Sequence, residues 1–182
     1  MFTVSFIGLG NRGGIYANYF SQNSAVRIVS GCDVNVDRAL ELHTRYGVDK
    51  KNVFTDEEIF FKEKRSDVLV IATLDNLHRE QAVRALRLGY DVLLEKPIDV
   101  TVTEAKKLIE IAEHSGKKFA IMLNQRTNKL FQKAHEIVQS GLLGELKRTV
   151  WIVTNWYRSQ HYYDSGTWRA TWAGEGGGVL LL

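Results

Sequence analysis

Short apolar runs alternate with amphipathic segments along the first two thirds of the chain, and this alternation limits the folds open to it. Five runs are almost continuously apolar, namely Phe2–Ile7, Val26–Cys32, Val68–Ala72, Val92–Leu94 and Phe119–Leu123. Strands covered on both faces of a parallel sheet have this composition. Strands that alternate with helices along a chain form a doubly wound α/β sheet, because each parallel connection returns through a helix. The sequence therefore predicts a fold of this class.

The segments between the apolar runs carry the signals of helices. Apolar and charged residues recur with helical spacing in Asp37–Tyr46, Arg79–Leu88 and Glu104–His114. Thr55 with Glu58, and Thr101 with Glu104, have the spacing of a capping box, in which a threonine side chain bonds a backbone N–H at the start of a helix. We expect a helix to begin at both places.

Composition and charge exclude several classes of protein. The formal net charge is only +3, and no part of the sequence has the dense basic patch that nucleic-acid binding needs. The single cysteine, Cys32, excludes an internal disulfide and a thiolate zinc cluster, and no pair of histidines has metal-ligand spacing with carboxylate support. No apolar run approaches the ~18–20 residues of a membrane span. We expect a cytoplasmic protein with no metal, nucleic acid or membrane as partner.

A glycine-rich turn, Gly8-Leu9-Gly10-Asn11-Arg12-Gly13, follows the first apolar run. In this spacing the first glycine permits a tight turn, the second lets a pyrophosphate approach the backbone, and the third lets a helix pack on the strand. The following helix, through Ile15–Phe20, would direct its N–H groups at the phosphates. We assign Gly8, Gly10, Asn11, Arg12 and Gly13 to cofactor binding. The alternative is a purely structural turn between strand and helix.

Asp33 ends the second apolar run, where dinucleotide-binding folds place the residue that binds the adenosine ribose. A carboxylate there can accept both ribose hydroxyls and repels a 2′-phosphate. The sequence therefore favours NAD over NADP as the cofactor, although Arg12 and Arg38 could soften that preference. The alternative interpretation of Asp33 is an aspartate exposed to solvent.

Two groups of residues follow two later apolar runs. The first group follows Val68–Ala72 and contains Thr73, Asp75 and His78; the second follows Val92–Leu94 and contains Glu95, Lys96 and Pro97. Ligands of an open α/β sheet bind beyond the carboxyl ends of its strands, so we expect both groups to face the crevice of the glycine turn. Pro97, the single proline, restricts Lys96 to an extended backbone and so directs its side chain. For His78, contact with the nicotinamide ribose and capping of a helix on the sheet are equal alternatives. The residues that we assign to cofactor binding are Thr73, Asp75, His78, Glu95, Lys96 and Pro97.

Together with the glycine turn and Asp33, these residues resemble the glucose–fructose oxidoreductase/inositol dehydrogenase family, the Gfo/Idh/MocA oxidoreductases. Further matching segments, in the family's order, are Asn124-Gln125-Arg126, Gly141-Leu142-Leu143-Gly144-Glu145-Leu146 and Gly176-Gly177-Gly178. The resemblance implies an NAD(P)-binding Rossmann domain followed by an open-sheet α/β domain that makes dimer or tetramer contacts. It also implies hydride transfer between the cofactor and a hydroxyl carbon of a sugar, sugar acid or inositol. Leu74 departs from the pattern, because the family often has proline there.

These implications give an enzymatic hypothesis in which Lys96 is the catalytic residue. Its ammonium group would orient the substrate hydroxyl or stabilise the charge that develops on the oxygen; a surface lysine at a strand end is the alternative. Arg126, Trp168 and Arg169 are candidates for substrate binding, since aromatic faces stack on sugar rings, with an interdomain salt bridge or a packed loop as alternatives. The competing hypothesis is a non-catalytic NAD-binding sensor or scaffold.

A change in composition near Gln125 separates two predicted domains. Residues 1–125 form the NAD-binding Rossmann domain, and residues 126–182 form the beginning of the substrate and oligomerisation domain. The latter starts with a helix over Asn128–Gln139 and a strand-like run over Lys147–Tyr157, and it contains all four tryptophans. The chain ends in the apolar run Val179–Leu182. We therefore expect a fragment that binds NAD but lacks the Asp-x-x-x-His pair that the resemblance implies for proton transfer.

Overall fold

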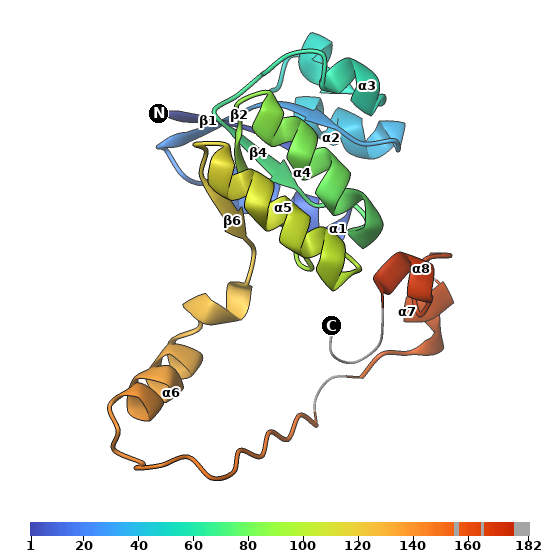
Figure 1. Ribbon diagram of the computed structural model, residues 1–182. Coiled ribbons are helices and arrows are strands. Elements are labelled where there is room, and N and C mark those ends of the chain that lie inside the picture. The colour runs from blue at the N-terminus through green and yellow to red at the C-terminus, as the bar shows by residue number, and fades with distance from the viewer. Residues whose placement is uncertain (155–156, 165, 177–182) are drawn as a thin grey trace. The chain divides into compact units, whose positions relative to one another are not determined.

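A six-stranded parallel sheet in the order β3-β2-β1-β4-β5-β6 forms the centre of the first part of the chain (Figure 1). The computed structural model describes residues 1–154, 157–164 and 166–176. The strands are β1 (Phe2–Ile7), β2 (Val26–Cys32), β3 (Val53–Phe54), β4 (Val68–Ile71), β5 (Asp91–Leu94) and β6 (Phe119–Ile121). The chain starts in the middle of the sheet, extends to one edge, and returns beside β1 to build the other half. This order confirms the doubly wound, Rossmann-type fold.

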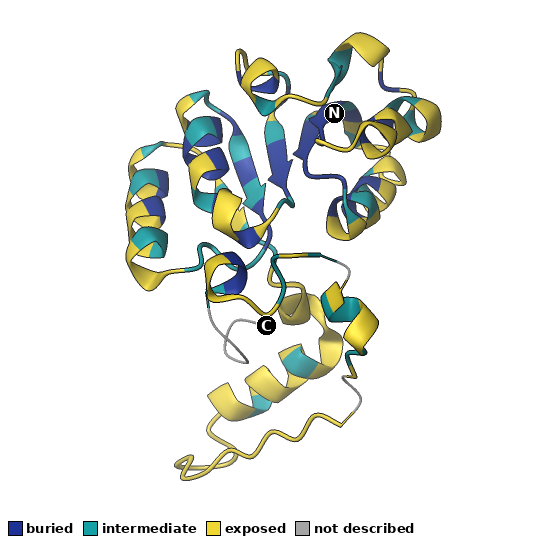
Figure 2. Ribbon diagram, turned by 90° about the vertical axis from the view of Figure 1, so that its right-hand side faces the viewer, coloured by how far each residue is buried: buried dark blue, intermediate teal, exposed yellow. Residues whose placement is uncertain are grey.

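Helices cover both faces of this sheet (Figure 2). They are α1 (Asn11–Ser21), α2 (Val36–Tyr46), α3 (Glu57–Phe60), α4 (His78–Arg87) and α5 (Val102–His114), with short 3-10 turns η1 (Lys50–Asn52) and η2 (Asp75–Leu77). Alternate side chains of β1 enter two separate cores, because successive residues of a strand point to opposite faces. Phe6 packs in the core that includes α1 and α2, and Ile7 in the core that includes α4 and α5.

The five apolar runs all form strands, and the predicted helices between them are present. Thr101 caps α5 by accepting from the Glu104 backbone N–H at 3.3 Å, as its spacing predicts. The expected cap at Thr55 is wrong: Asp56 caps α3, since its Oδ1 accepts from the Glu58 N–H at 2.8 Å. Aspartate at that place reaches the N–H groups of the first turn directly. The strand β3 was not predicted, because two residues are too few to show a pattern.

The chain divides into two compact units. One contains Met1–Met122 and the segment that begins at Ala170, including the short helix α8 (Trp172–Glu175); the other is Leu123–Arg169. The second unit contains η3 (Asn124–Thr127), α6 (Lys129–Gln139) and α7 (Gln160–Asp164). Its predicted assignment to an open-sheet domain beginning at residue 126 stays a prediction.

The strand expected over Lys147–Tyr157 is wrong for the residues that the structure describes there. Residues 147–154 and Tyr157 pair with no neighbouring strand. An alternating sequence forms a strand only where another strand takes up its backbone hydrogen bonds. The apolar run Val179–Leu182, with Gly177 and Gly178, lies outside the described residues. Within the described part, no helix is long and apolar enough to span a membrane.

Candidate functional site

The glycine turn closes against the end of β4 at a place that admits no side chain. Gly8 follows β1 with a φ of +84°, and a Cβ atom there would lie 2.6 Å from both the carbonyl carbon and the oxygen of Ala72. A Cβ on Gly13 would overlap the carbonyl oxygen of Gly8. Both glycines are therefore required for α1 to start directly beside the carboxyl ends of β1 and β4.

The amino terminus of α1 is open to an anionic ligand. Gly10 is the N-cap residue, and the first turn contains no acidic side chain that would occupy the unpaired N–H groups. A Cβ atom at Gly10 would meet only the Arg38 guanidinium, at 3.7 Å. The exposed N–H groups, the positive end of the helix dipole and the two nearby arginines, Arg12 and Arg38, suit a pyrophosphate. The turn therefore fits the cofactor that its spacing predicts.

Asp33 is held rigidly beside this turn. Its Oδ2 accepts from the Leu9 N–H at 2.6 Å, and its Oδ1 accepts from the Asn35 N–H at 2.8 Å. The side chain is buried, so the alternative of a solvent-exposed aspartate does not hold. A carboxylate oxygen can accept more than one hydrogen bond, so each oxygen retains capacity for a ribose hydroxyl. Asp33 thus joins the glycine turn to the end of β2.

The segment after β4 places Thr73 and Asp75 beside the turn. The Thr73 hydroxyl donates to Gln81 Oε1 at 2.6 Å, and Gln81 Nε2 donates to Glu57 Oε2 at 2.7 Å. These two hydrogen bonds are partly buried and connect the segment after β4 to α4 and α3; no spacing in the sequence predicts them. Burial raises the pKa of Asp75, and the nearby carboxylate of Glu175 acts in the same direction, whereas Lys96 acts against them. Asp75 therefore retains a proton more readily than an exposed aspartate.

His78 is fully buried and supports the turn that carries Lys96. Its Nδ1 lies 2.7 Å from the Pro97 carbonyl oxygen, which can only accept, so Nδ1 carries the proton. Nε2 has no hydrogen-bond partner among the residues described. The helix-capping alternative is wrong, because α4 has no side-chain cap hydrogen bond and the ring bonds the Pro97 carbonyl instead. The contact with the nicotinamide ribose stays a prediction, although the ring is fully buried. The Lys96–Pro97 peptide bond that it supports is cis.

Glu95 connects the glycine turn to Lys96. Its Oε1 accepts from the hydroxyl of Tyr16, in α1, and lies 4.0 Å from Arg12 Nε. Its Oε2 accepts from the Lys96 N–H at 2.8 Å. Tyr16 was not predicted as a site residue, because nothing in its spacing distinguishes it from other core residues of a helix. The half-buried Lys96 forms no ion pair within the described chain.

The helix α8 packs against η2 and so belongs to this region. Glu175 is almost completely buried, and its Oε2 accepts from the Ala170 N–H at 2.6 Å. A Cβ atom on Gly176 would overlap the Val100 carbonyl, so the segment lies tightly on the chain after Pro97. Glu175 was also not predicted, since its contact with Asp75 depends on segments far apart in sequence.

The three candidates for substrate binding belong to the unit Leu123–Arg169. Arg169 stacks over Trp168, with 4.4 Å from its guanidinium carbon to the ring centroid, and donates a hydrogen bond to Tyr162. Arg126 lies in η3 with an exposed side chain. Their role in substrate binding stays a prediction.

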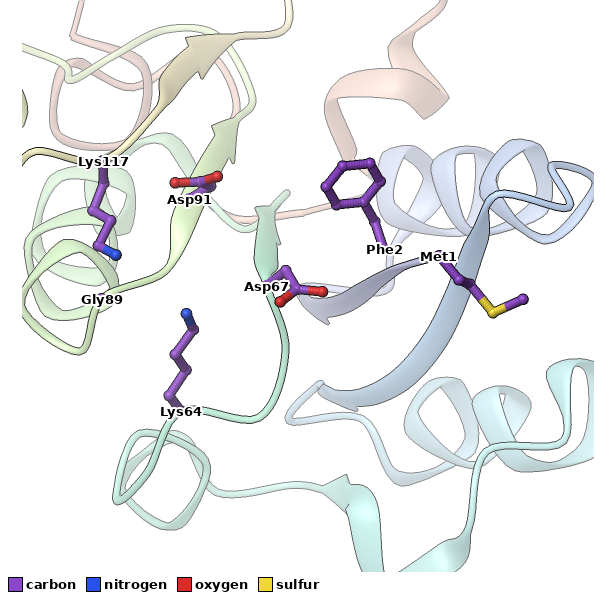
Figure 3. A pocket seen from close by; sticks show the side chains of 7 residues that line it. All are labelled: Met1, Phe2, Lys64, Asp67, Gly89, Asp91 and Lys117. Atoms are coloured by element: carbon purple, nitrogen blue, oxygen red, sulfur yellow. The ribbon is translucent and has the colours of Figure 1, made fainter.

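A shallow hollow of about 380 Å³ lies at the amino ends of the strands, on the side of the sheet away from the glycine turn (Figure 3). Its lining includes Lys64, Asp67, Asp91 and Lys117. Asp67 already accepts from the backbone N–H and the hydroxyl of Thr3. This hollow is remote from the glycine turn and from Lys96, so it is not part of the candidate site.

Residues 2–123 match the model of a family described as oxidoreductases with an NAD-binding Rossmann fold. The chain is 27% identical over 179 residues to an alpha-N-acetylgalactosaminidase of Shewanella oneidensis, and 26% identical to a glycosyl hydrolase family 109 protein of Shewanella pealeana. Both matches cover 93% of this chain and 39% of the relative. The chain therefore spans well under half the length of these curated relatives.

Solved structures with the same fold include two dehydrogenases. The WlbA dehydrogenase from Bordetella pertussis, in complex with NADH and UDP-GlcNAcA, matches with a TM-score of 0.82 and 21% identity, over 95% of this chain and 53% of that one. The scyllo-inositol dehydrogenase from Lactobacillus casei, with bound NAD(H) and scyllo-inositol, matches with a TM-score of 0.74 and 22% identity, over 80% and 43%. At these identities the likeness shows a shared fold.

Proposed function

The chain belongs to the Gfo/Idh/MocA family of oxidoreductases and contains its NAD-binding Rossmann domain, and on that basis we propose that the protein transfers hydride between NAD and a hydroxyl carbon of a sugar, sugar acid or inositol. One observation carries the proposal: Glu95 bonds both to α1, which follows the glycine turn, and to the backbone of Lys96. A nucleotide site and a candidate donor to substrate are thereby held together at one edge of the sheet. The dehydrogenase neighbours support the chemistry.

NAD, when bound, supplies the hydride acceptor. The chain's own residues bind and orient it: the N–H groups of α1 bind the pyrophosphate, and Asp33 binds the adenosine ribose. With the cofactor held in this way, Lys96, beyond the end of β5, would lie beside its nicotinamide. The Lys96 ammonium group would donate a hydrogen bond to the substrate hydroxyl, which orients the reacting carbon and stabilises partial negative charge on the oxygen.

Replacing Asp33 with alanine tests the nucleotide part of this proposal. The substitution removes two carboxylate bonds to the ribose and the repulsion of a 2′-phosphate. Each charge-assisted hydrogen bond contributes about 1.5–3 kcal/mol, so the loss of two lets us expect NADH affinity to fall by roughly 100- to 10,000-fold, and NADPH affinity to fall less. Titration of the protein with NADH and with NADPH, followed by the fluorescence of the reduced nicotinamide, measures the change.

Asp37→Ala is the matched control, because Asp37 is an exposed carboxylate in the first turn of α2, close in sequence to Asp33. It should leave both affinities within about twofold. If Asp33→Ala lowered NADH and NADPH binding equally, Asp33 would only be an anchor for Leu9 and Asn35, and would not select the cofactor.

A second candidate function, cleavage of a glycosidic bond, is favoured by the relative named alpha-N-acetylgalactosaminidase. A bound NAD does not exclude it, because some glycosidases depend on NAD. Release of nitrophenol from nitrophenyl α-N-acetylgalactosaminide, measured with and without NAD, distinguishes the candidates. NAD-dependent release without net NADH formation would favour the glycosidase; steady NADH formation with free polyols would favour the dehydrogenase.

A further inference from the structure

Glu95 is a buried charge whose orientation is fixed from three directions. Its side chain is 8% exposed, and its two oxygens accept from the Tyr16 hydroxyl and the Lys96 N–H, with the Arg12 guanidinium close by. A buried carboxylate is costly unless it is paired and hydrogen-bonded, and here those conditions are met. The group therefore contributes a negative charge at a defined place beyond the end of β5.

Tyr16 can only act as the donor in this arrangement. Burial raises the pKa of the Tyr16 hydroxyl well above its usual range, and its hydrogen bond to Glu95 adds to the effect. The hydroxyl keeps its proton, and Glu95 accepts it in a hydrogen bond. The negative charge consequently lies on Glu95.

The two positive charges of this edge, on Arg12 and Lys96, are less constrained than the charge of Glu95. Arg12 has a side chain that is 49% exposed, so solvent screens its charge. Lys96 carries its charge at the end of a long side chain that forms no ion pair in the described chain. Glu95 is thus a fixed, poorly screened negative charge beside the place where we put the nicotinamide.

We infer that Glu95 sets the preference of the site for oxidised over reduced cofactor, because its carboxylate attracts the positively charged nicotinamide ring of NAD⁺ and not the neutral ring of NADH. This inference rests on the proposed function, which places that ring next to Lys96. A pair of unit charges roughly 10 Å apart in an effective dielectric constant of ~20 changes an equilibrium constant by about tenfold. Such a preference drives the site towards oxidation of the hydroxyl carbon.

The ratio Kd(NAD⁺)/Kd(NADH) isolates this effect. The two forms share the adenosine, both riboses and the pyrophosphate, and differ in the charge of one ring. A change in the glycine turn alters both constants together and leaves the ratio unchanged. A change in the electrostatic potential at the nicotinamide alters the ratio.

The experiment is Glu95→Gln, with Kd(NADH) measured by nicotinamide fluorescence and Kd(NAD⁺) by displacement of NADH. Glutamine keeps an acceptor for the Lys96 N–H and places an amide beside the Tyr16 oxygen, so the shape of the site is retained. We expect the ratio to rise about tenfold. Asp91→Asn is the matched control: Asp91 begins the same strand, β5, and lines the hollow of Figure 3 at the other edge of the sheet. The ratio Kd(NAD⁺)/Kd(NADH) of Asp91→Asn should stay within about twofold of that of the unaltered protein.

An unchanged ratio in Glu95→Gln, with both constants weakened alike, would overturn the inference and leave Glu95 as an anchor for α1. Absence of NADH and NAD⁺ binding to the unaltered protein would instead contradict the proposed function. Should Glu95→Gln fail to fold, the pair Tyr16→Phe with Glu95→Leu replaces the two buried partners by apolar groups, a change that proteins often tolerate. The same rise in the ratio is expected of that pair, and an unchanged ratio there would overturn the inference equally.

Discussion

Alanine at Gly13 is expected to abolish NADH binding and to destabilise the fold, whereas alanine at the adjacent Gly14 should preserve both. A Cβ atom on Gly13 would overlap the Gly8 carbonyl oxygen, a backbone atom that cannot move without opening the turn. Overpacking of this kind costs about 1–3 kcal/mol, and the displaced turn would no longer direct the N–H groups of α1 at a pyrophosphate. We expect NADH affinity to fall by more than roughly 100-fold.

Gly14 is the matched control for this substitution. The nearest atom to a Cβ there is the Leu9 carbonyl oxygen, at 4.0 Å, so alanine fits. Alanine also favours the helical backbone by up to about 1 kcal/mol over glycine. NADH titration and thermal unfolding of both variants give the comparison. Normal NADH binding by Gly13→Ala would show that the glycine turn does not hold the pyrophosphate.

Lys96→Met is expected to reduce turnover of the intact protein by roughly 100- to 10,000-fold, the usual contribution of a positioned donor to a proton-transfer or oxyanion step. Methionine preserves the length and much of the apolar stem of lysine and removes the ammonium group. The backbone N–H that bonds Glu95 is retained, so the glycine turn and its link to β5 should persist. The measurement is kcat with the best polyol or sugar substrate, alongside NADH affinity.

Lys117→Met provides the comparison for a lysine at the other edge of the sheet, in the hollow away from the glycine turn. Its turnover should stay within about twofold of the unaltered protein. Normal turnover by Lys96→Met would remove Lys96 from the catalytic role. Loss of NADH binding by Lys96→Met would mean that the lysine acts mainly on the cofactor.

The sheet was predictable because its signal is local. Five of the six strands are short apolar runs, and amphipathic helical segments lie between them, one of which has its predicted cap at Thr101. The glycine turn and Asp33 were predictable for a related reason. Their chemistry depends on a spacing along the chain that the parallel crossover turns into proximity.

The rest of the site depends on contacts that leave no pattern in the sequence. Tyr16 meets Glu95 across the end of the sheet, and Gln81 links Thr73 to Glu57, yet none of these pairs has a fixed spacing. Glu175 reaches the neighbourhood of Asp75 from a still more distant segment. His78 shows the opposite difficulty: a polar residue at a strand end suggests a ligand contact, but its burial makes it a support for Pro97.

The route of the chain also governs the order in which the protein is assembled. The sheet uses only Met1–Met122, so a ribosome has delivered all six strands before Leu123–Arg169 emerges. Glu175, which belongs to the same unit, arrives only after that intervening stretch. Closing a longer loop costs only about 0.6 kcal/mol for each doubling of its length, so the intervening stretch adds little to the free-energy cost of docking α8. Because α8 is synthesised last, it also docks last. During synthesis, η2, which carries Asp75, therefore lacks its contact with α8 until that last segment has emerged.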